Sequence, residues 1–327
     1  MPSTLRIGTL GAARITPNAL IKPAEQIDGV EVTAIAARDS RRAEEFAKAN
    51  RIPRVLATYD DLISDPGIDI IYNPLPNSLH CEWTIRALHA GKHVLCEKPL
   101  ASNAAEAERM AQAASASGRI LGDAFHYCYH PLAARVRELI SNGTLGKLVY
   151  VESSFAAPIA PPNIRYDWSL AGGATMDLGC YPLHMIRFFT GITPRVVRAA
   201  ASTVAENIDV AMDVNMELGP GVTARMTCAM GKDVQFGASF IARGDRGEGK
   251  VVNPIAPHRG HQLTIKTNAG ETQESVPGDP TYTYQLHAFA DAVRGQGKFQ
   301  TDGADGVVSM RIIDAVYRAA GLPPRGT

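Results

Sequence analysis

Cysteine is scarce in this sequence, and its pattern excludes a disulfide or zinc framework. The 327 residues include five cysteines, an odd number, and no two of them have CxxC spacing or a histidine in CxxH spacing. The five are Cys81, Cys96, Cys128, Cys180 and Cys228. We therefore expect reduced thiols, no bound metal and a cytoplasmic location.

Long apolar runs and an excess of charge of one sign are also missing. No segment has the length of a membrane span, and the stretch MPSTLRIGTLGAAR lacks the apolar core of a secretory signal. Lys plus Arg and Asp plus Glu both number 33, so the composition indicates neither a nucleic-acid nor an anionic-membrane partner. The length predicts about two domains, at roughly 150 residues each.

Apolar runs alternate with helical patterns in the first third of the chain. The runs that predict strands lie at residues 5–10, 30–37, 67–73, 93–97 and 118–122. Continuous apolar strands between helices indicate a parallel sheet that is covered on both faces. The sequence therefore predicts an α/β Rossmann domain, a doubly wound fold that binds ligands at the carboxyl ends of its strands.

Polar and charged residues follow two of these strands directly. Asn73 and Pro74 leave the third strand, with His80 shortly after, and Glu97 and Lys98 leave the fourth. A charged group at the end of a buried strand is costly unless it is paired or takes part in function. We expect these residues to face a cofactor, with Glu97 anchoring Lys98 or a ribose. The alternative for Glu97 is a structural end of the strand.

The turn after the first strand is a weak form of the glycine-rich dinucleotide motif. Ala13 and Thr16 stand where the motif has its second and third glycines. Gly11 allows a tight turn, and the small side chains that follow leave room for a pyrophosphate at the N-terminus of the next helix. We expect a cofactor-binding turn formed by Gly11, Ala12, Ala13, Arg14 and Ile15. The alternative is a plain connector between a strand and a helix.

The end of the second strand indicates which dinucleotide binds. Enzymes that use NAD usually place an acid here to hold the ribose hydroxyls, whereas this chain has Ala37 and Arg38. A guanidinium suits the 2′-phosphate of NADP. Asp39 is the competing ribose ligand, but we expect it to cap the helix at 40–50. NADP is therefore the expected cofactor, with NAD as the alternative.

Alternating strands replace this pattern in the second half of the chain. The segment 211–230 contains two of them around a Gly-Pro-Gly turn, which predicts a hairpin. In its first strand, apolar residues from Met212 to Leu218 alternate with polar ones. The sequence therefore predicts a C-terminal α+β domain with a large open antiparallel sheet, followed by helices near 282–295 and 304–319.

The change of pattern also sets the expected domain boundary. We place a dinucleotide-binding domain at 1–125 and a substrate-binding and oligomerisation domain at 126–327, with the last helix expected to pack back on the first domain. The second sheet lacks covering helices on one face, so apolar side chains at alternate positions would meet water. We therefore expect a homodimer or homotetramer that forms through this sheet.

Three ionisable residues share one face of a helix predicted between the two sheets. Asp177, Tyr181 and His184 have i, i+4, i+7 spacing. Pro182 interrupts the regular helix and is expected to distort this face. Any one of the three can be a hydrogen-bonded core residue, but three aligned ionisable groups in an apolar helix favour a functional site.

Two blocks of the sequence resemble a known enzyme family. They are YNPLPNSLHCEWTIRALHAGKHVLCEKPLA at 72–101 and GGATMDLGCYPLHMIRF at 172–188. Both are similar to the Gfo/Idh/MocA oxidoreductases, in particular to the branch that contains sugar dehydrogenases and dimeric dihydrodiol dehydrogenases. The resemblance implies hydride transfer between a nicotinamide cofactor and a hydroxyl or carbonyl carbon. The implied substrate is a sugar, a sugar derivative or a vicinal diol.

The resemblance also implies roles for individual residues. Lys98 would reach the substrate hydroxyl and the nicotinamide, and the peptide bond before Pro99 would be cis. Tyr181 would act as the acid/base, with Asp177 one turn earlier. A tyrosine is a poor base near pH 7 unless a cation stabilises its phenolate, and Lys98 is the available cation.

Other positions match the family only in part. Asn163 and Arg165 correspond to a segment near the sugar, and His184 stands where many relatives have an aspartate, so we expect substrate contacts from these three. His184 is also the rival base. Cys128 replaces a family arginine, and His126 is new.

Two other functions stay open at this stage. An NAD-dependent glycosidase would use transient oxidation with a tightly held cofactor and no net redox change. A non-catalytic cofactor-binding regulator would need neither Lys98 nor Tyr181, and the presence of both makes it the weakest alternative.

Overall fold

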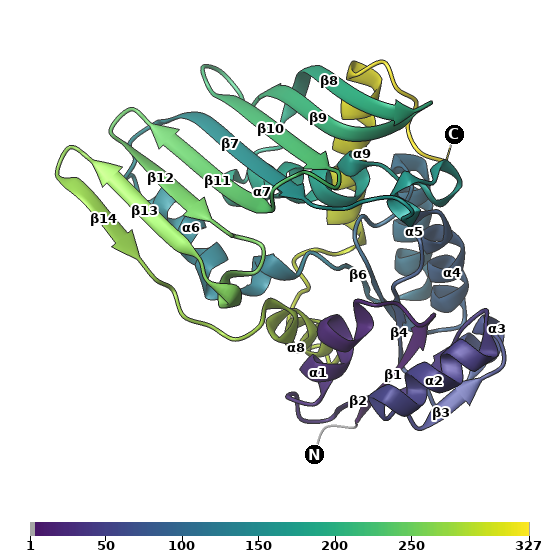
Figure 1. The fold of residues 1–327 in the computed structure, drawn as a ribbon. Helices are drawn as coiled ribbons and strands as arrows, with labels where there is room; N and C mark the ends of the chain where they lie inside the picture. The colour runs from purple at the N-terminus through teal and green to yellow at the C-terminus, as the bar shows by residue number, and fades with distance from the viewer. Residues whose placement is uncertain (1–3, 327) are drawn as a thin grey trace. The chain divides into compact units, whose positions relative to one another are not determined.

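The computed structural model describes residues 4–326, which form two compact units. Unit 1 consists of residues 4–125 together with Tyr282–Val307. Unit 2 consists of His126–Thr281 together with the described residues from Val308 onward. Each unit is built on one β-sheet (Figure 1).

Unit 1 contains a six-stranded sheet with strand order β3-β2-β1-β4-β5-β6, and all of these strands are parallel. The strands are β1 (Leu5–Leu10), β2 (Val30–Ala36), β3 (Arg54–Leu56), β4 (Ile70–Asn73), β5 (His93–Cys96) and β6 (Leu121–Asp123). Every residue of β4 is buried, so both faces of the sheet are covered there. The predicted Rossmann sheet is confirmed, and its strand order reverses between β1 and β4, where such folds bind ligands.

Helices connect the strands of unit 1. They are α1 (Lys22–Ala24), α2 (Ser40–Asn50), α3 (Tyr59–Ser64), α4 (Asn77–His89) and α5 (Ala104–Ser117), with most of α8 (Thr281–Val293) and the first part of α9 (Gly303–Ala319). Asp39 caps α2 as predicted, because its carboxylate accepts the N–H of Arg42 at 3.0 Å. The sequence did not predict β3, since three residues at a sheet edge are too few to show a pattern.

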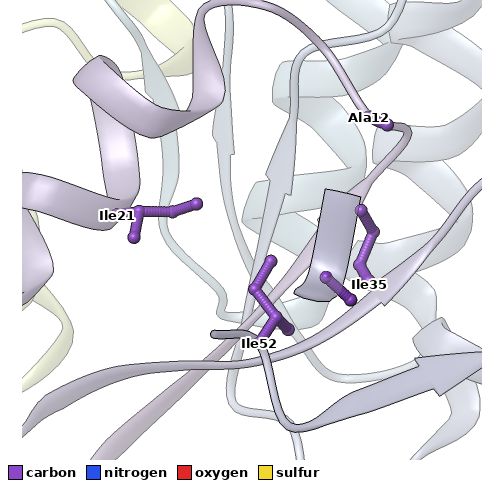
Figure 2. Close-up of a cluster of buried hydrophobic side chains, with 5 residues drawn as sticks. Ala12, Ile21, Ile35 and Ile52 are labelled. Carbon is purple, nitrogen blue, oxygen red and sulfur yellow. The ribbon is translucent and has the colours of Figure 1, made fainter. Parts of the chain in front are cut away.

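A small apolar cluster holds the turn after β1 against β2 and α2. Its buried members are Ala12, Ile21, Ile35, Ala47 and Ile52. Figure 2 shows Ile21, Ile35 and Ile52 directed toward a common space. Burial of apolar surface stabilises such a cluster by about 25 cal/mol per Å². The cluster therefore holds the turn in place through the buried side chain of Ala12.

The helix expected directly at this turn begins later in the chain. A π-helical segment starts at Pro17 and continues into α1. Proline lacks an N–H group and has a fixed φ, and both properties favour it in the first turn of a helix. Residues 12–15 consequently precede the helical segment, and the Ile15 carbonyl accepts the N–H of Ala19 at its start.

Unit 2 contains an eight-stranded sheet with strand order β14-β13-β12-β11-β7-β10-β9-β8. The strands are β7 (Leu148–Ala157), β8 (Arg195–Ala205), β9 (Ile208–Glu217), β10 (Thr223–Met230), β11 (Gly237–Gly244), β12 (Gly247–Val252), β13 (Gln262–Thr267) and β14 (Gly270–Glu274). The helices α6 (Pro131–Ser141), α7 (Cys180–Thr190) and most of α9 belong to the same unit. The predicted antiparallel sheet and the 211–230 hairpin are confirmed, with one parallel pair, β7 and β10.

The two faces of this sheet differ in chemistry. Met212, Val214 and Met216 of β9 are at most 2% exposed, as their alternation predicts. On the opposite face Arg225 of β10 pairs with Asp213 of β9, with 2.6 Å between the guanidinium nitrogen and the carboxylate oxygen. We expected apolar side chains on the open face of the sheet. For β9 and β10 this expectation is wrong, because the apolar side chains of β9 lie on the buried face. Paired charges can stay solvated, so this face needs no cover for that reason alone.

Three strands of unit 2 were not predicted from the sequence: β8, β13 and β14. For β8 and β14 the reason is exposure. Most side chains of β8 and all but one of β14 are exposed, so neither strand shows an alternation of buried and exposed residues. Both lie at the edges of the sheet, where one neighbour supplies the backbone hydrogen bonds. Pairing with that neighbour, and not local preference, makes them strands.

Candidate functional site

Two buried polar side chains hold the loops after β4 and β5 of unit 1. The amide nitrogen of Asn73 donates to the Thr84 hydroxyl at 3.1 Å. His80 is fully buried, with its ring nitrogens 2.8 Å from the Leu75 carbonyl oxygen and 3.0 Å from the Pro99 carbonyl oxygen. Burial outweighs these acceptors and lowers the pKa of His80 to about 4. Both side chains therefore shape the loops from inside the protein.

Glu97 and Lys98 begin the loop after β5. The Glu97 carboxylate accepts a hydrogen bond from the Tyr72 hydroxyl at 2.7 Å. Burial, and then the charge of Glu97, raise the pKa of Tyr72, so this phenol stays protonated and donates. The Lys98–Pro99 peptide bond is cis, as the resemblance implies, and Lys98 is half-buried. Tyr72 is thus an anchor for Glu97 that the sequence did not predict.

The turn after β1 requires glycine at its first position. Gly11 has φ of 77°, which is left-handed, and its N–H donates to the Ala36 carbonyl at 2.7 Å. A Cβ at this position would lie 3.1 Å from a methyl carbon of Leu75. Beyond Gly11, the side chains of Ala12 and Ala13 are buried and half-buried, and those of Arg14 and Ile15 are exposed. Pro74, after β4, is half-buried.

Two exposed guanidinium groups lie near this turn. Arg38 follows the buried Ala37 at the end of β2, and Arg42 donates to the Ala12 carbonyl at 2.8 Å. Tyr59 accepts the backbone N–H of Arg38, while burial raises the pKa of its phenol. The competing acid at the end of β2 is committed to the cap of α2. A glycine turn with two nearby cations fits a dinucleotide that carries an extra phosphate.

In unit 2, Tyr181 is one end of a buried chain of hydrogen bonds. Its hydroxyl oxygen lies 3.1 Å from Nε2 of His126, and Nδ1 of His126 lies 2.7 Å from the Thr281 hydroxyl. The three residues are at most 5% exposed. A neutral imidazole can accept at one nitrogen and donate at the other, so the chain can hold a proton at either end. The sequence marked His126 only as a departure from the family and gave no sign of Thr281.

His184 has a different partner. Its Nδ1 lies 2.6 Å from the Tyr127 hydroxyl, and its ring stacks on Phe188 at 5.7 Å between centroids. The side chain is 1% exposed. Tyr181 and His184 therefore face the same short 3-10 helix, His126–Tyr129, but bond to successive residues of it.

Asp177 lies on a π-helical turn, Thr175–Gly179, that precedes α7. Its carboxylate lies 2.5 Å from the guanidinium of Arg165. Burial alone lowers the pKa of Arg165, but the charge of Asp177 outweighs it and the pKa is raised. The Asn163 side-chain oxygen accepts from Arg165 at 3.2 Å and orients it. Arg165 and Asp177 thus present a charge pair beside Tyr181, whose phenol also contributes to the raised pKa.

The distortion expected at Pro182 takes the form of this π turn. Pro182 lies in the first turn of α7 and has no N–H to donate back to Leu178, four residues earlier. The N–H of Cys180 instead reaches the Thr175 carbonyl, five residues earlier. Asp177 therefore lies on the π turn, whereas Tyr181 and His184 lie on α7.

Residues 4–326 show neither a metal centre nor a membrane span. In that part of the chain no cluster of three or more His, Cys, Asp and Glu side chains is arranged to hold a metal ion. Within the same residues, no helix is both long and apolar enough to cross a membrane.

A Rossmann sheet with a glycine turn is typical of dinucleotide-binding proteins. In this chain it is joined to an α+β unit that carries a buried tyrosine, the arrangement expected of a two-domain dinucleotide-dependent oxidoreductase. Family models agree with this description. The model described as "Oxidoreductase family, NAD-binding Rossmann fold" matches residues 5–125, and that of the GFO/IDH/MocA C-terminal domain matches residues 133–249. The chain belongs to the Gfo/Idh/MocA family of oxidoreductases, and its dinucleotide-binding domain takes a nicotinamide cofactor.

Individual relatives cover three quarters of the chain or more. D-xylose 1-dehydrogenase (NADP(+)) 2 of Haloferax volcanii is 35% identical over 97% of this chain and 97% of its own length. Trans-1,2-dihydrobenzene-1,2-diol dehydrogenase of Sus scrofa is 32% identical over 76% of this chain and 74% of its own. A 3-ketoreductase of Actinomadura kijaniata, solved with NADP and TDP-benzene, has a TM-score of 0.90 at 29% identity and covers 97% of this chain and 98% of its own.

Proposed function

We propose that this protein is an NADP(H)-preferring oxidoreductase that acts on a CH–OH carbon of a sugar, a sugar derivative or a vicinal diol. The observation that carries the proposal is the buried Tyr181 hydroxyl, 3.1 Å from His126 and beside the Arg165–Asp177 pair. A phenol with a proton partner next to groups that bind hydroxyls is suited to alcohol oxidation. Support for the substrate class comes from relatives whose names specify D-xylose and a dihydrobenzenediol.

We propose cofactor contacts from the unit 1 residues around the glycine turn and the strand ends. The turn Gly11–Ile15 would hold the pyrophosphate, and Arg38, which follows the buried Ala37, would pair with the 2′-phosphate. The part of this site at the carboxyl ends of β4 and β5 would be formed by Asn73, Pro74, His80 and Glu97. NADP preference is supported by the exposed guanidinium of Arg38 and by the commitment of Asp39 to the cap of α2. A relative in the same family was solved with NADP.

We propose that Tyr181, Lys98 and Asp177 are the catalytic residues. A bound nicotinamide cofactor would supply the hydride acceptor. Tyr181 takes the hydroxyl proton of the substrate while the hydride leaves the same carbon, so the carbon becomes a carbonyl. The family resemblance makes Lys98 the cation that would stabilise the phenolate. Within unit 2, the chain through His126 would hold or return the proton. In ketone reduction each of these transfers runs in reverse.

Substrate binding is assigned to the residues around the Arg165–Asp177 pair. Both groups are partly exposed, with 36% and 16% of their side-chain surface accessible, so their remaining hydrogen-bonding capacity can reach sugar hydroxyls. Asn163 orients Arg165. We propose that His184 contributes through Tyr127, since its ring is 1% exposed and bonded to that phenol. Tyr181 is therefore preferred to His184 as the base.

The test is a substrate panel with the purified protein. Aldoses, anhydro sugars and vicinal diols are offered with NADP⁺ or NAD⁺, and formation of the reduced nicotinamide is followed by its absorbance. We expect turnover with at least one of these classes and a higher kcat/KM with NADP⁺. Cleavage of a glycoside by protein with tightly bound cofactor, and no net reduction, would replace this proposal with the glycosidase.

We further propose a homodimer or homotetramer that forms through the open face of the unit 2 sheet, and a cytoplasmic location. The proposal rests on the sequence, which predicts no covering helices on this face; the Arg225–Asp213 pair lies on it. All five cysteines lie within the described residues, and each is a buried thiol outside any disulfide. Light scattering at micromolar concentration tests the assembly, and a monomer would contradict it.

A further inference from the structure

One arginine of unit 2 is completely buried. Arg325 lies in the segment after α9, drawn in yellow in Figure 1, and its exposed fraction is 0%. Its guanidinium lies 2.5 Å from the carboxylate of Asp209, which is also fully buried. Arginine and aspartate are almost never buried to this degree unless they are paired, and the cost of removing them from water must be met by good geometry. The other contacts of Arg325 and Asp209 show which segment the pair holds in place.

The carboxylate of Asp209 connects the pair to the π turn. One of its oxygens accepts from the Tyr317 hydroxyl at 3.0 Å in addition to Arg325. The other accepts the backbone N–H of Thr175 at 2.7 Å. Thr175 is the first residue of the π turn and stands two residues before Asp177. Asp209 therefore fixes the start of the turn that presents Asp177.

The guanidinium of Arg325 contacts the loop that precedes the π turn. Its Nε donates to the Gly172 carbonyl at 2.6 Å. Its central carbon lies 4.6 Å from the ring centroid of Trp168 and 4.0 Å from that of Tyr317, so the planar group is in contact with two aromatic rings. Trp168 follows Arg165 by three residues. The contacts of Arg325 thus span the segment that carries Arg165 at one end and Asp177 at the other.

Two glycines make this close approach feasible. Gly173 has φ of 130°, and a Cβ there would lie 2.2 Å from an Asp209 carboxylate oxygen and 2.6 Å from an Arg325 nitrogen. A Cβ at Gly172 would lie 2.6 Å from the Arg165 carbonyl oxygen. Any larger residue would push the loop away from the buried pair. The Gly-Gly sequence is therefore matched to Arg325 and Asp209, which stand far from it in the chain.

We propose that Arg325 is a positioning residue that, through Asp209, Gly172 and Trp168, fixes the 165–179 segment in the conformation that presents Arg165 and Asp177 to substrate. The inference rests on the proposed function, because it takes Arg165 as a substrate-binding group and Asp177 as a catalytic residue. The fixed segment itself can be measured without any enzymatic activity.

The first measurement uses tryptophan fluorescence. The chain has two tryptophans, so Trp83→Phe leaves Trp168, which contacts Arg325, as the only reporter. In this background we compare Arg325→Met and Arg325→Lys. We expect acrylamide quenching of Trp168 to rise several-fold in Arg325→Met and less in Arg325→Lys. The matched control is Arg318→Met, which removes an arginine of α9 that pairs with Asp314 and is 64% exposed, and it should change nothing.

The second measurement is hydrogen exchange followed by mass spectrometry. We expect Arg325→Met to lose protection in peptides from 165–179 and to keep it in β9 and β10. Because an unpaired buried charge can unfold a protein, the double variant Arg325→Met/Asp209→Leu removes both charges together. It should be more stable than Arg325→Met and should still lose protection in this segment. Unchanged quenching and exchange in both variants would overturn the inference, whatever the activity.

The third measurement links the segment to substrate. In Arg325→Met and in the double variant, we expect kcat/KM for the sugar or diol to fall about tenfold or more, and NADP(H) affinity to stay unchanged. Lysine carries the charge but cannot donate to Asp209 and Gly172 together in a planar fork, so Arg325→Lys should recover stability more fully than kcat/KM. A loosened segment with unchanged kcat/KM would refute the positioning role. A wild type without turnover on any substrate would refute the proposed function alone, since exchange still decides whether Arg325 fixes the segment.

Discussion

Replacement of His126 by leucine removes the proton partner of Tyr181 and keeps an apolar side chain in a buried position. The hydrogen bond between them is 3.1 Å long and lies among side chains at most 5% exposed. A neutral buried hydrogen bond contributes about 0.5–1.5 kcal/mol net, and 1.4 kcal/mol is a factor of ten in rate. If His126 acts by orienting Tyr181 and holding its proton, His126→Leu should therefore lower kcat about tenfold.

Tyr181→Phe removes the acid/base itself, so its effect should be larger. A placed acid or base contributes about 10²–10⁴ in rate, and we expect a loss in that range. His126 acts on the reaction only through the Tyr181 hydroxyl in this account. The double variant should consequently be no slower than Tyr181→Phe alone, which is a strongly non-additive cycle.

The assay is a double-mutant cycle with two readouts. Steady-state kcat is measured with the best substrate of the panel, and the free energy of unfolding is measured by urea denaturation of the same four proteins. The stability cycle should give a coupling energy of about 1 kcal/mol between Tyr181 and His126. His89→Leu replaces an exposed histidine of α4 and serves as the control, with neither quantity expected to change. A double variant about tenfold slower than Tyr181→Phe would refute the reasoning, because His126 would then act independently of Tyr181.

Three further outcomes are expected. Arg38→Ala should weaken NADP(H) binding by about 1.5–3 kcal/mol, the range for a hydrogen bond to a charged group, with NAD(H) binding unchanged in a titration; an unaltered NADP preference would contradict the assignment. Lys98→Met should lower kcat strongly with little change in NADP(H) affinity, and adding Tyr181→Phe should cost little more; independent, multiplying effects would separate the two residues. The pKa of His80 is about 4 in the folded protein and about 6.5 in the unfolded chain. As pH falls, the unfolded chain therefore binds the proton first, and the free energy of unfolding decreases by about 3 kcal/mol between pH 6.5 and 4. His80→Gln should lack this part of the acid-side loss in urea denaturation at several pH values, and an identical pH dependence in the variant would contradict the buried neutral imidazole.

Much of the fold follows from local sequence pattern. The strands β1, β2, β4 and β5 are mostly apolar runs, and β4 is buried on both faces, as expected for a covered parallel sheet. The cap of α2 was predictable because Asp39 bonds to a residue three positions away. The hairpin of β9 and β10 was predictable because its alternation and its turn lie within 20 residues of sequence, 211–230. In each case the residues that interact are neighbours in the chain.

The partners of the candidate site residues lie beyond the reach of such patterns. The sequence singled out Tyr181 and Asp177 by spacing and resemblance, but not what holds them. Tyr181 bonds to a residue 55 positions earlier, and that residue bonds to another 155 positions later. The π turn that separates Asp177 from α7 also follows no periodicity that a sequence displays.

The sequence by itself determined the Rossmann sheet, the glycine turn, the basic end of β2 and the residue types available for catalysis, because these depend on short-range pattern. Only the tertiary structure decided that His126 and Thr281 complete a chain from Tyr181, and that His184 belongs to Tyr127. Only it placed Arg325 on Asp209, 116 positions away, where neither side chain is exposed. A buried polar group bonds to a partner that the folded chain places within hydrogen-bond distance. For these residues that partner is determined by the packing of unit 2 as a whole and not by the neighbouring sequence.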